Sequence, residues 1–276
     1  MRHFRAVIAL LCACCAPLTA AEPIRVVTSI RPLQLLAVAV GGDAVKVDAL
    51  LDANSSPHDY QLRPSDRMKL DRADLVVWIG PSLEHFLQPV LKVVQRRTMV
   101  IALDDGAADP HLWMDPLAMR AAAQRLAAVY AQLRPQQAEL FRQNVLRLQV
   151  ALDREDAWLR QRLASPEKRG YIVEHDAYDR FESRYGLSHA AALTDRSELP
   201  PSVSKLIFLR KQLDSGAVGC VLTEPGESAQ IRSLTQQRSA VVVRLDPMAA
   251  NVEMGPEGLA QFYRQLGAAI ATCVEG

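Results

Sequence analysis

The chain has 276 residues, of which 49% are hydrophobic and 23% are charged. This composition excludes a disordered chain, a collagen-like chain and a disulfide miniprotein, and the length suffices for two lobes of about 100 to 130 residues each. The 32 basic and 31 acidic residues give a net charge of +1, without a notable run of Lys or Arg. The charge pattern therefore does not favour a nucleic-acid or polyanion partner.

Residues 1–21 have the pattern of a secretory signal peptide. Arg2 and Arg5 precede an apolar stretch from Ala6 to Leu18, and Thr19–Ala21 supplies the small residues that a signal peptidase reads. The apolar stretch is shorter than the ~20 residues needed to cross a bilayer, so we expect cleavage after export instead of a membrane span. Minor alternatives are a buried N-terminal helix and a lipid anchor at the lipoprotein-like box Leu11–Cys14.

Three of the five cysteines lie in this segment, so the mature chain retains only Cys220 and Cys273. In an exported protein, an even pair of cysteines indicates a disulfide bond. Two unconnected buried thiols are the alternative.

The first half of the mature chain alternates short β-branched runs with stretches of helical length. This alternation predicts a parallel sheet that is covered by helices on both faces. The expected strands are Ile24–Ser29, Ala44–Leu51, Asp74–Ile79 and Thr98–Leu103, and the expected helices are Pro32–Val40, Pro64–Ala73 and Pro81–Gln95.

Two longer helices follow. Asp115 and Pro116 read as an N-cap and a first helical residue, and Pro135 opens a second helix that continues to Ala164. A helix of this length spans about 45 Å, which is too long for one lobe. We therefore expect it to run along both lobes and to fix their separation.

The strand and helix alternation restarts after residue 170. The expected strands are Tyr171–Glu174, Ala190–Leu193, Ala217–Thr223 and Ala240–Leu245, and the expected helices are Ala177–Tyr185, Ser202–Leu213, Ser228–Gln237 and Pro256–Thr272. The sequence thus predicts an α/β fold with two parallel-sheet lobes, at 22–132 and 166–276, joined by a long rigid backbone helix at 133–165. A ligand site is expected in the cleft between the lobes.

Three histidines follow predicted strands directly or within the next loop. His58, His111 and His175 therefore lie beyond the carboxyl ends of parallel strands, where open α/β sheets bind ligands. Three neutral imidazoles suit Zn²⁺, with water or Asp246 as the fourth ligand. Asp59, Asp115 and Asp176 are candidates to hold the second ring nitrogens. From this pattern alone, unrelated loop or core histidines remain an alternative.

The other candidate groups are weaker. His85 and His189 do not follow strands in this way, and we interpret them as surface or core residues. The acidic residues Asp104, Asp105 and Asp109 predict a solvated loop, or a weak electrostatic funnel for cations. The chain contains no HExxH, no GxSxG and no Gly-rich phosphate loop, so an enzyme is not expected.

Four segments occur in an order that resembles the periplasmic zinc receptors of ABC importers. They are Ser56–Asp66, Ala73–Gly80, His111–Pro116 and His175–Tyr178. The resemblance extends from about Ile24 to the C-terminus. It implies two α/β lobes with a backbone helix, a buried Zn²⁺ held by His58, His111 and His175, and a disulfide between Cys220 and Cys273.

The resemblance also implies a function. We expect a monomeric, non-enzymatic receptor that captures Zn²⁺ in the periplasm and delivers it to an ABC-type permease. Capture should weaken as the pH falls through the imidazole range near ~6.5, because the ligands must be deprotonated. A manganese or iron receptor of the same family, a zinc hydrolase and an adhesin of the same fold are the alternatives.

Two departures from the family pattern are visible. Many zinc receptors carry a long His- and Asp-rich loop before the second ligand, whereas this chain has only the short segment from Asp104 to His111. Some relatives also have a carboxylate before the first histidine, where this chain has Pro57. The resemblance therefore predicts weak auxiliary metal capture and leaves the fourth ligand open.

Overall fold

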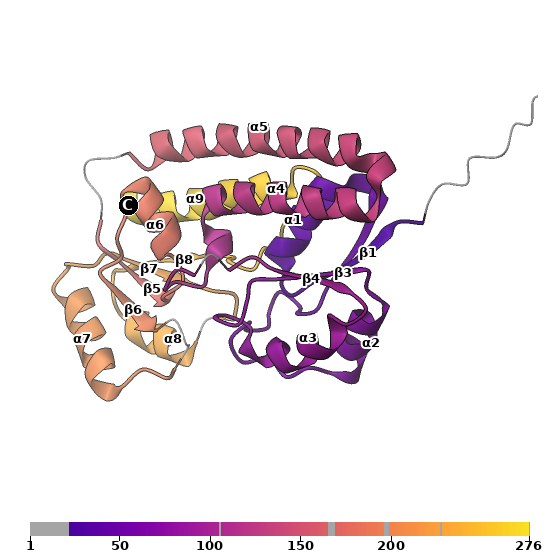
Figure 1. The fold of residues 1–276 in the computed structure, drawn as a ribbon. Coiled ribbons are helices and arrows are strands. Elements are labelled where there is room, and N and C mark those ends of the chain that lie inside the picture. Colours follow the sequence, from indigo (N-terminus) through magenta and orange to yellow (C-terminus); the bar gives the residue numbers. More distant parts are fainter. Residues whose placement is uncertain (1–21, 105, 165–168, 196–198, 227, 276) are drawn as a thin grey trace, which may run out of the picture.

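The computed structural model describes residues 22–104, 106–164, 169–195, 199–226 and 228–275. The predicted signal peptide and its possible lipoprotein box lie outside the described residues. Within them, eight strands form two four-stranded parallel sheets, which confirms the predicted α/β class (Figure 1). No helix in the described ranges is long and apolar enough to cross a membrane.

The first sheet has the strand order β2-β1-β3-β4. Its central strand β3 is buried along its whole length, whereas the edge strand β2 alternates between half-buried and exposed residues. The strands are β1 (Ile24–Thr28), β2 (Val45–Ala49), β3 (Leu75–Trp78) and β4 (Met99–Ala102). The helices α1 (Arg31–Gly41) and α2 (Pro64–Arg72) lie within one residue of the predicted ranges.

The helix predicted over Pro81–Gln95 is shorter in the structure. Only a 3₁₀ turn, His85–Leu87, and α3 (Gln88–Val94) are helical. Pro89 lacks a backbone N–H and is tolerated only in the first turn of a helix, so α3 begins one residue before it. Upstream, the buried Glu84 carboxylate accepts hydrogen bonds from the N–H groups of Ile79 and Gly80, which holds this segment as a turn.

The second sheet repeats this topology in the order β6-β5-β7-β8. Its strands are β5 (Tyr171–His175), β6 (Ala191–Thr194), β7 (Cys220–Thr223) and β8 (Val241–Arg244). The covering helices are α6 (Asp179–Tyr185), α7 (Val203–Asp214), α8 (Ala229–Thr235) and α9 (Gly258–Glu275). Ser202 and Ser228 start α7 and α8, because each hydroxyl accepts a backbone N–H of the first turn.

A layer of long helices lies over both sheets (Figure 1). The Asp115 carboxylate accepts the Leu117 N–H at 2.8 Å and starts α4 (Pro116–Leu133), as predicted. The next helix, α5 (Ala138–Arg162), spans about 37 Å and packs against α1, α4 and α9. It starts after a 3₁₀ turn at Pro135–Gln137, so it is shorter than predicted. One hydrophobic core continues through this layer into both sheets.

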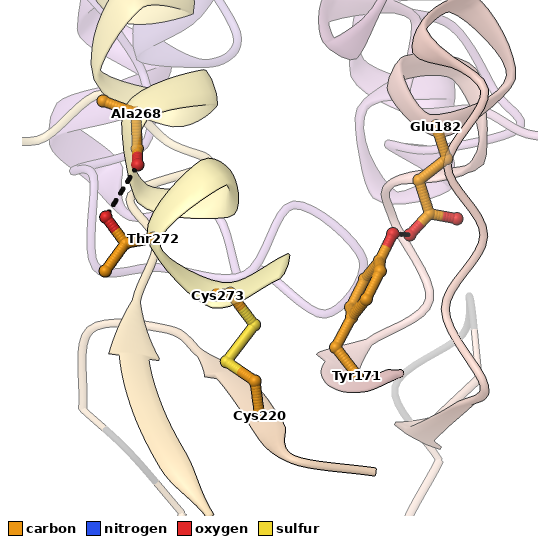
Figure 2. The surroundings of a disulfide bond; sticks show 6 residues. All are labelled: Tyr171, Glu182, Cys220, Ala268, Thr272 and Cys273. Atoms are coloured by element: carbon orange, nitrogen blue, oxygen red, sulfur yellow. Dashed lines mark hydrogen bonds between the residues drawn. A yellow bond between two sulfur atoms is a disulfide. The ribbon is translucent and has the colours of Figure 1, made fainter. Parts of the chain in front are cut away.

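The predicted disulfide bond between Cys220 and Cys273 is present. It joins β7 to the last turn of α9, and both cysteines are fully buried (Figure 2). The bond therefore ties the C-terminal helix, which is part of the helical layer, to the centre of the second sheet.

We expect the double variant Cys220→Ser/Cys273→Ser to lose roughly 4 kcal/mol of unfolding free energy, the chain-entropy value for a loop of 53 residues. Urea denaturation of the oxidised protein and of the double variant would measure the difference. Reduced wild-type protein is the control and should match the variant. An unchanged unfolding free energy would contradict a stabilising role for the bond.

Candidate metal centre

The three histidines predicted from the strand ends meet at one point. The Nε2 atom of His111 lies 3.2 Å from the Nε2 atoms of both His58 and His175. Two ligands that bind Zn²⁺ tetrahedrally at ~2.0 to 2.1 Å are themselves about 3.3 Å apart, so the spacing fits one such ion. His58 follows β2, His111 follows β4 and His175 ends β5, so both sheets contribute.

His58 is held by the loop that leads into α2. The buried Asp66 carboxylate accepts hydrogen bonds from the Arg63 N–H at 2.9 Å and from the Tyr60 hydroxyl at 3.0 Å. The backbone N–H of His58 in turn donates to the Ser56 hydroxyl. These contacts give the side chains of Ser56, Tyr60 and Asp66 a role in fixing the loop between His58 and the helix start.

His111 is oriented by Asp109. One Asp109 carboxylate oxygen accepts both the backbone N–H of His111, at 3.0 Å, and its ring Nδ1–H, at 2.7 Å. This assigns the proton to Nδ1, so the Nε2 lone pair faces the other two histidines. Arg180 of α6 donates two hydrogen bonds to the Asp109 carbonyl, which links the second lobe to this loop.

The Asp109 carboxylate stays ionised in this environment. Burial by itself would raise its pKa, but the hydrogen bonds from His111 and the charge of Arg180 hold the pKa below its usual value. A charged carboxylate behind the ring makes the opposite nitrogen a stronger metal ligand.

His175 is placed by the end of β5 and by Glu174 before it. The Glu174 carboxylate accepts hydrogen bonds from the Thr223 hydroxyl and from the N–H groups of Glu224 and Ser228. It therefore anchors the loop that follows β7 beside the metal centre. The Thr194 hydroxyl lies 3.4 Å from Nδ1 of His175.

Burial and mutual repulsion keep two of the rings neutral. Desolvation, followed by the nearby ring of His111, lowers the pKa of His58 to about 4. Desolvation and the rings of His111 and His58 lower the pKa of His175 to about 3. At neutral pH these rings therefore present lone pairs instead of protons, as metal ligation requires.

The three histidines line a cavity of about 350 Å³ between the two sheets. Its walls include the loops after β2 and β7, the Trp113 ring packed against His111, and Met248. Hydrogen bonds join the two halves near the cavity: Trp113 donates to the Pro247 carbonyl, and Arg31 of α1 donates to the Ala249 and Val252 carbonyls. The lobes are thus tied together beside the centre.

Asp246, one of the two candidates for the fourth ligand, does not join the histidines. Among the described residues, the group of ligand atoms that lie within 4.8 Å of one another here contains His58, His111 and His175 and does not include Asp246. The Asp246 carboxylate instead accepts the N–H groups of Ala250 and Asn251, both at 2.9 Å. These bonds hold the turn that carries Met248, so Asp246 shapes the cavity wall.

The expected partners of the ring nitrogens also differ. Asp115 caps α4, Asp59 is exposed, and Asp176 faces His189. The prediction missed Asp109, which was assigned to a solvated loop and is 8% exposed. Its position two residues before His111 was the available signal, because an Asp in such a turn can bond the backbone N–H two residues later.

The other two histidines in the described part of the chain are not part of the centre. His85 is exposed and contacts the Phe86 ring. His189 is largely buried, and its Nδ1 lies 2.9 Å from the Glu182 carboxylate.

Comparison with known proteins agrees with this fold. The structure superposes on a crystal structure of ZnuA with a TM-score of 0.82 at 24% identity, covering 91% of this chain and 99% of that one. A zinc-bound deletion mutant of ZnuA gives a TM-score of 0.81 at 25% identity, with coverages of 91% and 98%.

Sequence relatives cover the same extent. The high-affinity zinc uptake system protein ZnuA of Yersinia pestis is 28% identical over 91% of both chains. Residues 26–273 match the family described as zinc-uptake complex component A, periplasmic, or ZnuA. The names of these relatives denote uptake proteins and not enzymes. Since the match covers nearly the whole chain, this protein belongs to the family of the periplasmic zinc-uptake complex component A.

Proposed function

We propose that this protein captures Zn²⁺ in the periplasm and delivers it to an ABC-type import permease. The proposal rests on three imidazole Nε2 atoms that converge in a cavity between the sheets. The Nε2 atom of His111 lies 3.2 Å from that of His58 and 3.2 Å from that of His175. His58, His111 and His175 are the proposed ligands. A water oxygen in the cavity completes a tetrahedral set, since both Asp246 oxygens are engaged elsewhere.

The chemistry of the ligands supports zinc over manganese or iron. All three protein ligands are imidazole nitrogens, which suit Zn²⁺, whereas Mn²⁺ prefers carboxylate and carbonyl oxygens and lies lowest in the affinity order. At equal free concentrations Zn²⁺ therefore outcompetes Mn²⁺.

The proposal includes several further features. The protein acts as a receptor and not as an enzyme, is exported through the segment 1–21, and works as a monomer. Its lobes correspond to residues 22–132 and 166–276 with the connecting helix at 133–165. The continuous core and the hydrogen bonds of Arg31 across the cleft support a molecule in which the lobes hold a nearly constant separation.

Zinc is expected to raise the melting temperature of the purified protein. At a free Zn²⁺ concentration 100 times its Kd, mass action stabilises the fold by ≈ 2.7 kcal/mol, or about 5 to 10 °C for a chain of this size. We expect His58→Ala to abolish most of this shift. His85→Ala, which removes an exposed histidine outside the centre, is the control and should retain it. A full shift in His58→Ala would contradict the proposed ligand set.

Asp109 should contribute to affinity without touching the ion. We expect Asp109→Asn to weaken Zn²⁺ binding by about 10- to 100-fold, because His111 loses its charged hydrogen-bond acceptor. Competition with a chromophoric chelator measures the change. Asp59→Asn, beside His58 but exposed, is the matched control and should bind like the wild type. Equal loss in both variants would overturn the assigned role of Asp109.

The affinity for Zn²⁺ should begin to fall at a lower pH than the sequence analysis predicts. Protons compete with Zn²⁺ for ring nitrogens, so affinity falls as pH falls, but only near the pKa of the folded protein. With His58 near 4 and His175 near 3, we expect little change in affinity between about pH 7.5 and 5.5. Chelator competition across this range is the test, and a steep loss that begins near ~6.5 would contradict the expectation.

A further inference from the structure

A second group of potential metal ligands lies outside the three-histidine centre. Ligand atoms of Asp176, Asp179 and His189 all lie within 4.8 Å of one another. Asp176 follows β5 directly, Asp179 starts α6, and His189 lies in the loop between α6 and β6. The proposed capture of zinc by the first centre uses none of these side chains.

The imidazole of His189 is oriented from behind by Glu182. Its Nδ1 lies 2.9 Å from one Glu182 oxygen, and the other oxygen accepts the Tyr171 hydroxyl at 2.6 Å (Figure 2). The Glu182 side chain is only 5% exposed, so its position is determined by these contacts. The Nε2 atom of His189 faces Asp176, 3.9 Å from Oδ1, which is too long for a hydrogen bond. A carboxylate behind a histidine whose other nitrogen faces further ligands is the arrangement typical of metal sites.

The charge of this group favours a cation. Burial alone would lower the pKa of His189, but the hydrogen bond to Glu182 and the charges of Asp176 and Asp179 outweigh burial and raise it. The same negative potential attracts a divalent ion, which would compete with the proton for Nε2.

We propose that Asp176, Asp179 and His189 form a second binding site for a divalent cation of the Zn²⁺ type, with Glu182 as the residue that positions His189. One imidazole nitrogen, two carboxylate oxygens and a water make a ligand set that zinc accepts. The ligand atoms of a tetrahedral zinc site are about 3.3 Å apart. Binding would therefore require His189 Nε2 and Asp176 Oδ1, now 3.9 Å apart, to approach each other by about 0.6 Å. The half-buried ligands and this required shift make the second site weaker than the first.

The position of the second site suggests its role. Asp176 is the backbone neighbour of His175, so an ion held there would be linked to the first centre through the end of β5. This role rests on the proposed function, whereas the binding itself does not, because the two ligand sets share no residue.

Zinc stoichiometry of the untagged protein tests the proposal. Equilibrium dialysis at pH 7.5 and about 10 µM free Zn²⁺ fills a site with a Kd of ~1 µM to about nine-tenths. Elemental analysis should then give two ions per chain in the wild type and one in His189→Gln. Asp179→Asn should also bind one ion, and it leaves the contact between His189 and Glu182 in place. His85→Gln, an exposed histidine of the first lobe, is the control and should bind two.

The outcomes separate the two sites. The double variant His58→Ala/His111→Ala should retain one ion at the second site. This ion is expected whether or not His58, His111 and His175 bind zinc, because the two sites share no residue. A single ion in the wild type that the double variant loses would overturn the second site. Two ions in both His189→Gln and Asp179→Asn would overturn it as well. Melting curves would identify a variant that fails to fold.

Discussion

The centre of this protein depends on the electrostatic state of three imidazole rings. Nitrogen atoms 3.2 Å apart can be tolerated when each presents a lone pair to a shared cation, and they repel when protonated. Burial enforces the first state, because it lowers the pKa values of His58 and His175 far below neutrality. At neutral pH these two rings therefore offer lone pairs that a metal ion such as Zn²⁺ can accept. The fold must therefore keep these rings facing one another.

The layer of long helices holds the two sheets in a fixed relative orientation. Two separate sheets contribute the rings, so a small rotation between the sheets would separate the nitrogens. α5 packs on helices of both halves, and one hydrophobic core runs through them without interruption. Arg31, Trp113 and Arg180 add hydrogen bonds that cross the cleft next to the rings. The disulfide between β7 and α9 extends this support to the second sheet.

The short loop before His111 has a defined structural role. Its buried Asp109 accepts two hydrogen bonds from His111, and the Asp109 carbonyl accepts hydrogen bonds from Arg180 of the other lobe. The same residue therefore orients the His111 ring and links the two lobes. Pro57, which directly precedes His58, has no side-chain oxygen to offer an ion. With Asp246 held in its own turn, the ligands that we propose for this centre are all nitrogens, and such a set favours zinc over harder ions.

The sequence by itself determined the class of fold, the eight described strands and the placement of three histidines beyond strand ends, because alternation and strand ends are local patterns with a general spatial meaning. The prediction started helix α3 too early, at Pro81, although Pro89 already indicated where it begins. The tertiary structure alone decided that Asp109 supports His111, that Asp246 faces its own turn, and that His189 meets Asp176 and Glu182. Those choices depend on the direction in which each side chain points and on partners far along the chain, such as Arg180. A linear pattern carries no such direction, since only packing of the two lobes selects one hydrogen-bond arrangement among several.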